Sequence, residues 1–381
     1  MLPLSKVQTA SAGLTLDVQT GLPPPARSWK SAAAEGDFVE EAPAILPAAL
    51  RELWARDLAC PHFESHLVRI PSTIRILLPL DGHSTLGVSE DGRHYRISPS
   101  QVTPLVVEGW PGGRAGFGVN LGPGKLALST FEGEVVRGTI TDRTVRYEAP
   151  ARPFFGEPFA EIRALTGAAD GEPLVVTGVY GAIAIIRAQT STVVHRLAGG
   201  AVRVLHQRLA WTEEGEVLGL YRPASGQSGV WRLTFEPTPR VTTEVFGTSA
   251  LDTPNEIARV QGEWTIAGAH ADLRDQQGLF RNHGRGWEQF ASFLSTFRVE
   301  GLADAPAWDG VVFSTRNGAR VGAQARPGLG RPCAEVEYRP QQNGGGDVIG
   351  TIALADGRVI AALENLEEVL ILRPHRPWIG D

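Results

Sequence analysis

Short apolar and β-branched runs alternate with polar, glycine-containing turns along most of this chain. In one example, a run over residues 347–355 meets an Asp-Gly turn at 356–357, and a second run follows over 358–363. Such runs around Asp-Gly or Asn-Gly are typical of β-hairpins, because those turns need positive φ at their centre. The pattern therefore predicts short antiparallel strands rather than helices.

A glycine recurs at the tip of this pattern at intervals of 42 to 48 residues. The positions are Gly82, Gly124, Gly171, Gly215, Gly262, Gly310 and Gly357. A near-constant period of this size indicates a repeat architecture. Three strands per copy are clear, and a fourth fits between copies, as at residues 192–197, 243–246 and 334–338.

Four short strands per copy at this period resemble the blades of the β-propeller superfamily. A lone blade cannot bury both of its faces, whereas blades packed side by side can. We therefore expect an all-β fold: a seven-bladed β-propeller of four-stranded blades over residues 67–376. Two β-sandwiches are the alternative, but they would not require a near-constant interval. The recurring WD40 dipeptides and the sialidase-type Asp box are missing, so the resemblance points to no single family.

Residues 1–66 stand outside the period and form an N-terminal extension. A strand-like run at 14–18 could add the closing strand to the last blade, and a Pro-rich linker follows. Apolar residues then recur at helical spacing over about 44–59, which predicts one short amphipathic helix. That helix either packs on the ring or docks a partner through Trp54. Residues 377–381 form a C-terminal tail.

Composition narrows the classes of function. The chain has 36 Lys and Arg against 42 Asp and Glu, a net charge of −6, which argues against broad binding to nucleic acid. No apolar run approaches the roughly 20 residues of a membrane span. The first residues lack the features of a signal peptide, and the two cysteines are far apart. We expect a cytoplasmic protein.

The sequence offers little support for a metal or catalytic site. Residues 118–126 lack the first glycine and the Ser or Thr of a phosphate-binding loop. Cys60, His62, Glu64 and His66 are the densest group of candidate metal ligands, but Pro61 interrupts them and favours a structural turn. No Gly-x-Ser-x-Gly elbow occurs. We assign no catalytic residue, metal or cofactor.

An acid precedes the recurrent glycine in five of the copies. These acids are Asp81, Asp170, Glu214, Asp309 and Asp356. If the turns are equivalent, they form an acidic rim on one face that could steer a basic peptide or cation. The alternative is that Asp before Gly simply caps such turns.

Tryptophans crowd the fourth to sixth copies. Most can be explained by packing between blades, but Trp211 and Trp308 lie just before turn glycines. Exposed there, they would be anchors for a partner. Copies four to six are therefore the expected binding side of the ring.

The resemblance to β-propellers implies a binding platform more often than an enzyme. We expect a noncatalytic propeller that binds another protein or peptide, as a scaffold, adaptor or regulatory subunit of a multiprotein, bacterial-type assembly. One alternative is a hydrolase or lyase with a site in the central channel. Another is a carbohydrate-binding propeller.

Overall fold

The described part of the chain is built almost entirely of β-strands. The computed structural model describes residues 6–10, 13–17, 62–156, 160–197, 205–222, 228–246, 251–260, 262–270, 276–282, 287–294, 299–305, 310–315, 320–325, 334–337, 348–363 and 366–375. In these residues the only helical element is a 3-10 turn, η1 (Val179–Gly181). None of their helices is long and apolar enough to cross a membrane. The predicted helix at about 44–59, with Trp54, lies outside the described residues.

Six of the sheets have four strands. The first contains β4 (Ile74–Pro79), β5 (Thr85–Ser89), β6 (His94–Ser98) and β7 (Gln101–Pro104). The next two contain β13 (Ile162–Gly167), β14 (Leu174–Gly178), β15 (Ala182–Arg187) and β16 (Thr190–Arg196), then β17 (Leu205–Trp211), β18 (Val217–Arg222), β19 (Gly229–Thr234) and β20 (Arg240–Val245). Two more contain β21 (Leu251–Val260), β22 (Glu263–His270), β23 (Gln276–Asn282) and β24 (Trp287–Leu294), then β25 (Val299–Ala305), β26 (Gly310–Thr315), β27 (Arg320–Ala325) and β28 (Ala334–Glu337). The last contains β29 (Val348–Ala353), β30 (Val359–Leu363), β31 (Glu368–His375) and β3 (His62–Arg69).

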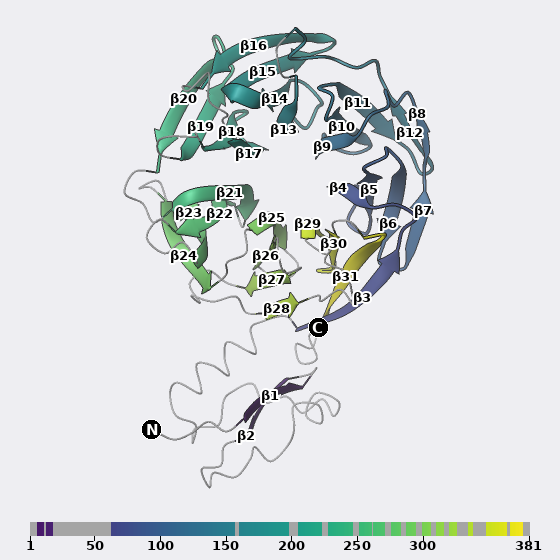
Figure 1. Cartoon of the computed structure of the whole chain (residues 1–381), viewed down its shortest axis with the longest axis vertical. Helices are drawn as coiled ribbons and strands as arrows, with labels where there is room; N and C mark the ends of the chain where they lie inside the picture. Colours follow the sequence, from purple (N-terminus) through teal and green to yellow (C-terminus); the bar gives the residue numbers. More distant parts are fainter. Residues whose placement is uncertain are drawn as a thin grey trace.

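The sheets are arranged as a ring, which confirms the prediction of an all-β propeller (Figure 1). The first strand of each sheet lies nearest the centre, and first strands of consecutive sheets contact one another. The ring closes where β29 meets β4. Each of these four-stranded sheets is antiparallel, and its neighbouring strands follow chain order as hairpin turns require, except that β3 pairs with β31 in the last sheet.

One sheet departs from the predicted four strands. It contains β9 (Ala115–Asn120), β10 (Lys125–Thr130), β11 (Val135–Ile140) and β12 (Thr144–Tyr147), with β8 (Val106–Glu108) as a fifth strand. The prediction of seven four-stranded blades is therefore wrong: six four-stranded blades accompany this five-stranded sheet. The cause is that the chain leaving β7 continues past the edge of the next sheet, where β8 pairs with β12 in parallel.

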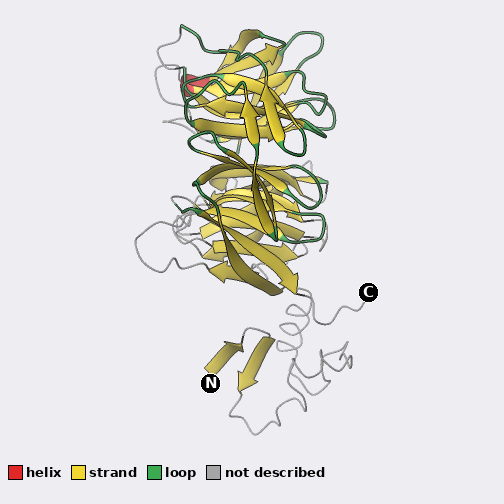
Figure 2. Ribbon diagram, turned by 90° about the vertical axis from the view of Figure 1, so that its right-hand side faces the viewer, coloured by secondary structure: helices red, strands yellow, loops and turns green. Residues whose placement is uncertain are grey.

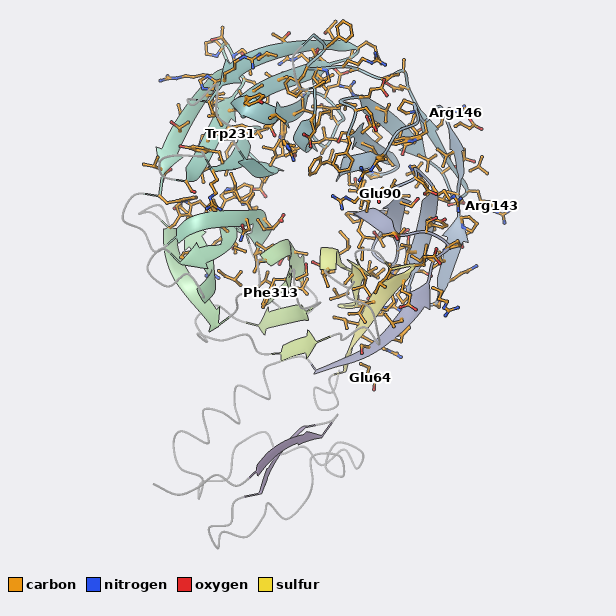
Figure 3. The ribbon with its side chains drawn as sticks, in the orientation of Figure 1. Glu64, Glu90, Arg143, Arg146, Trp231 and Phe313 are labelled. Carbon is orange, nitrogen blue, oxygen red and sulfur yellow. The ribbon has the colours of Figure 1, made fainter. Side chains whose placement is uncertain are left out.

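The added strand β8 is fixed by backbone and side-chain contacts. Val106 N–H donates to the Arg143 carbonyl at 2.8 Å, and Arg146 Nε lies 2.7 Å from Glu108 Oε2. Both arginines lie at the outer circumference of the ring (Figure 3). The strand β8 therefore ties one sheet to the outer edge of the next.

The strand that completes the last sheet is not the one expected. β3 pairs antiparallel with β31 along its whole length. The strand-like run at 14–18 does contain a strand, β2 (Gly13–Asp17), but it pairs with β1 (Lys6–Ala10) in a separate two-stranded sheet. The prediction that this run closes the last blade is wrong, because β3 has taken the edge of β31. The other proposed domain boundaries stay predictions.

The hydrophobic core is divided into clusters, and each is shared by two consecutive sheets. In β30, Val359, Ala361 and Leu363 join the cluster facing β25 and β26, whereas Ile360 and Ala362 join the cluster facing β4 and β6. Because side chains alternate between the two faces of a strand, an unbroken apolar run indicates burial on both faces. The unbroken apolar runs in the sequence therefore indicate strands that pack against a neighbouring sheet on each face.

A polar aromatic cluster joins the first sheet to the five-stranded one. His94 of β6 is fully buried, and its Nε2 lies 2.5 Å from the hydroxyl of Tyr147 in β12. Its Nδ1–H donates to the Gly92 carbonyl at 2.8 Å, so Nε2 is left to accept from Tyr147. Trp110 packs edge-on against both rings. Burial lowers the pKa of His94 to about 4, and it raises the pKa of Tyr147.

We predict that protonation of His94 destabilises the ring at mildly acidic pH. The pKa of His94 is about 4 in the folded state and about 6.5 in the unfolded state. The stability that neutral His94 contributes is therefore fully present above pH 6.5 and is lost as the pH falls towards 4. Urea unfolding at several pH values measures this effect. Over this range the free energy of unfolding of wild type should fall by about 3 kcal/mol more than that of His94→Gln. Equal losses in the two proteins would contradict the prediction.

Candidate functional site

The recurrent glycines lie on one face of the ring. Six of them lie between the first and second strands of their sheets, and Gly310 is the first residue of the second strand β26, so all seven are at the same side of the ring. We call this side the glycine-turn face; Figure 2 shows loops gathered on the two sides of the ring. Positive φ occurs at Gly124, Gly171, Gly215, Gly262 and Gly357, but not at Gly82. The turns share a position without sharing one conformation.

The carboxylate of Asp81 is engaged within its own turn. It accepts hydrogen bonds from the backbone N–H groups of His83 (2.8 Å) and Ser84 (2.7 Å) and from the Ser84 hydroxyl (2.8 Å). Partial burial alone would raise the pKa of Asp81, but these hydrogen bonds and the nearby charge of Arg96 bring it below its usual value. Asp81 therefore caps its turn.

Asp356 behaves in the same way in the last sheet. It accepts a hydrogen bond from the backbone N–H of Arg358 at 3.1 Å and forms an ion pair with the Arg358 guanidinium. Burial opposes ionisation, but the contacts with Arg358 and the charge of His83 outweigh it and lower the pKa of Asp356. The Ala355 N–H donates to the Gly82 carbonyl at 3.0 Å, so the turns of the last and first sheets touch.

The remaining acids of the proposed rim are more exposed or are not described. Asp170 accepts one hydrogen bond, from the Glu172 N–H at 3.1 Å. Glu214 is exposed, and hydrogen bonds from its own backbone N–H and from Thr212 lower its pKa. Asp309 lies outside the described residues.

Arginines neutralise much of the glycine-turn face. Arg96 lies 3.8 Å from Asp81 and 3.9 Å from Asp142, and Arg259 lies 2.7 Å from Glu213. Arg137 reaches the next sheet, where its Nε donates to the Gly171 carbonyl at 3.3 Å and its guanidinium lies 3.7 Å from Glu172. The face therefore carries alternating, paired charges, which weakens the case for a uniformly acidic rim.

The described tryptophans of the fourth and fifth copies pack between sheets. Trp231 is fully buried among the strands (Figure 3), and a Cβ added at Gly219 would lie 2.2 Å from its ring. Trp211 is only partly exposed and stacks on Phe235 at 5.3 Å between ring centroids. Trp264 and Trp287 pack against the core shared by β17–β20 and β21–β24. Trp308 lies outside the described residues.

The candidate metal ligands near the start of the ring are not arranged for zinc. β3 is extended, so His62 and His66 are about 13 Å apart along the strand instead of one helical turn apart. The His66 Nε2–H donates to the Pro99 carbonyl at 3.2 Å. Cys60 lies outside the described residues, and the described ones contain no group of three or more His, Cys, Asp or Glu placed for a metal.

The structure presents a different candidate on the opposite face, where second and third strands are joined. A hollow of about 410 Å³ lies beside the turn between β10 and β11, lined by residues 111–113 and 132–134, Arg152, residues 155–156 and Ala160. We call it the Phe155 hollow. Phe155 is 80% exposed, the most exposed large apolar side chain among the described residues.

Charges around the Phe155 hollow are held in place. Arg152 Nε donates to Glu134 Oε1 at 3.0 Å. Beside the hollow, the guanidinium groups of Arg75 and Arg114 lie 5.5 and 5.1 Å from the centroid of the Phe131 ring. Arg114 also forms an ion pair with Glu90, which lies near the centre of the ring (Figure 3). The arrangement offers one apolar anchor and several oriented polar groups.

Phe155 was not among the candidate residues predicted from the sequence. A signal was available: Phe154 and Phe155 are adjacent in a connector rich in Pro and Gly, outside any strand. Of the two side chains, Phe154 is buried and Phe155 is exposed.

We predict that Asp81 contributes to stability through its turn. Asp81→Ala removes the acceptor of three hydrogen bonds and should lower the free energy of unfolding by about 1–2 kcal/mol. Asp170→Ala, a matched control with one hydrogen bond, should change it by less than about 0.5 kcal/mol. Urea unfolding measures both, and equal effects would contradict the turn-capping role.

Comparisons with known proteins support the β-propeller fold but identify no family. No protein-family model and no curated protein matches this sequence. In structure, the chain is similar to the WD40 β-propeller domain of Doa1, with a TM-score of 0.57 and 12% identity over 84% of this chain and all of that domain. It is also similar to the β-propeller domain of Myceliophteria thermophila Cps50 (Swd1), with a TM-score of 0.59 and 10% identity over 80% of this chain and 98% of that one. Raptor of Chaetomium thermophilum matches 96% of this chain with 34% of its own, at a TM-score of 0.61 and 10% identity. The chain thus shares the propeller fold with WD40 structures.

Proposed function

We propose that this chain is a noncatalytic, cytoplasmic propeller that binds another protein, as a scaffold, adaptor or regulatory subunit of a multiprotein assembly. The observation that carries the proposal is Phe155, which is 80% exposed at the edge of a hollow. Burying one such side chain contributes about 1.5–3 kcal/mol. Aromatic anchors beside pockets often dominate binding between proteins.

The exposed phenyl ring is presented by a connector that is already ordered. Phe154, its neighbour, is buried in the core cluster between two sheets. Ala151 and Val135 exchange backbone hydrogen bonds of 2.8 Å, and the Phe155 N–H donates to the Arg152 carbonyl at 3.2 Å. Little ordering of this connector is then needed on binding, which lowers the entropic cost of a complex.

The size and chemistry of the Phe155 hollow favour a protein ligand. A volume of about 410 Å³ accommodates one or two large side chains. Its wall combines glycine backbone, one aromatic ring and the Arg152–Glu134 ion pair. An apolar centre with polar groups around it is typical of protein interfaces, in which an apolar core is surrounded by a polar rim.

The test is affinity capture followed by a direct binding measurement. The full chain captures its partner from cells that produce it, and the purified partner is then titrated by calorimetry against wild type, Phe155→Ser and Val106→Ser. Phe155→Ser should raise the dissociation constant at least about tenfold without lowering thermal stability. Val106→Ser removes another exposed apolar side chain, 60% exposed and on the outer strand β8, and should leave binding unchanged.

Two results would contradict the proposal. One is that no protein binds wild type saturably. The other is that a protein binds wild type and Phe155→Ser equally well.

A further inference from the structure

The outer strand β20 lies at the circumference of the ring, and within the described residues no strand pairs with its outer edge (Figure 1). It is the last strand of its sheet, and all of its residues except Val241 are exposed, including Val245 at 50%. Its six residues pair with β19 without a register shift. It contains no proline and no lysine. Such a regular, unprotected edge is a template for another strand.

The direction of its backbone groups can be worked out from β19. Phe246 N–H donates to the Ser228 carbonyl at 3.1 Å, directly beyond the paired residues Val245 and Gly229. Because N–H and C=O groups alternate in direction along a strand, Arg240, Thr242 and Glu244 also point theirs towards β19. The N–H and C=O groups of Val241, Thr243 and Val245 therefore point outwards.

Several other outer edges of the described ring are covered, interrupted or short, whereas β3, like β20, is an edge strand that pairs with its neighbour without a register shift. The edge of β12 is already taken by β8, which shows that an outer edge in this chain accepts an additional strand. The edge of β16 is interrupted by a register shift opposite Ile183 and Ala184. β7 has four residues and ends in proline, and β28 has four residues with two glutamates.

We propose that β20 pairs antiparallel with β20 of a second copy of this chain, forming a two-fold symmetric dimer. With Thr242 on the two-fold axis, Val241 of one copy lies opposite Thr243 of the other, and both direct their free backbone groups to the interface. Each such pair exchanges two hydrogen bonds. Self-pairing of one patch is the rule for two-fold dimers.

Charge complementarity selects the second copy as the occupant. In this register Arg240 lies opposite Glu244 of the other copy, and the symmetry repeats the pair. These positions are non-hydrogen-bonded ones, where opposite side chains come closest. Both residues are exposed, and within the described residues neither takes part in an ion pair. Opposite charges across strands are stabilising, and like charges are destabilising.

The experiment is sedimentation of the full chain over a range of concentrations, with charge-reversal variants. Wild type should show a monomer–dimer equilibrium. Arg240→Glu and Glu244→Arg each place like charges opposite one another, and each should weaken dimerisation by at least about tenfold. The double variant should restore it. A mixture of the two single variants should form a mixed dimer, because the reversed charges are then complementary.

Exposed substitutions of this kind change stability little, and circular dichroism checks that each variant is folded. The proposal is overturned if wild type stays monomeric at its highest soluble concentration. It is also overturned if the single variants dimerise as wild type does, or if neither the mixture nor the double variant recovers association. The dimer does not depend on the Phe155 hollow, so either proposal can fail alone.

Discussion

Burial of both faces of every sheet is the constraint on which this structure depends. A sheet such as β29–β31 places apolar side chains on both faces, so it needs a neighbour on each side. Each buried Leu or Ile contributes about 1.5–3 kcal/mol, whereas an exposed ion pair contributes about 0–1 kcal/mol. The clusters between sheets therefore outweigh the paired charges of the glycine-turn face. Only a closed ring satisfies every sheet at once.

Two elements, β3 and β8, break the regular repeat, and each of them connects parts of the ring. β3 comes from the start of the ring and completes the last sheet, so its hydrogen bonds with β31 join distant parts of the chain. β8 links the first sheet to the outer edge of the next. The His94–Tyr147 contact lies at that same junction and buries a neutral imidazole between the two sheets. The connector over residues 151–156 is held by backbone hydrogen bonds between Ala151 and Val135 and by the burial of Phe154.

The period of glycine turns and apolar runs was enough to predict the propeller, because both follow directly from strand geometry. Gly357 has positive φ, and the run at 358–363 is buried on both faces. The strands β3 and β8 were not predicted from the sequence, for a physical reason. β3 is an outer strand with residues such as Glu64 and His66, so it lacks the apolar run of an inner strand. β8 has only three residues, and its parallel pairing with β12 leaves no turn signal.

The candidate site was harder to predict, because exposure depends on how connectors lie on the finished ring. Asp81 and Asp356 were found by their place before a glycine, yet they serve their own turns. Phe155 follows no period, and it is exposed although Phe154 beside it is buried. Residues that recur before the turn glycines, such as Asp81 and Asp356, therefore stabilise the scaffold. Phe155 lies outside the period and marks one sector of the ring as a candidate binding site.

We propose that the ring binds a protein through the sector around Phe155. Hydrogen–deuterium exchange of the full chain, alone and with its captured partner, tests it most directly. Peptides covering residues 131–134 and 151–156 should gain protection when the partner binds, whereas the glycine turns of the other face should be unchanged. Protection confined to those glycine turns, or spread evenly over the ring, would contradict it.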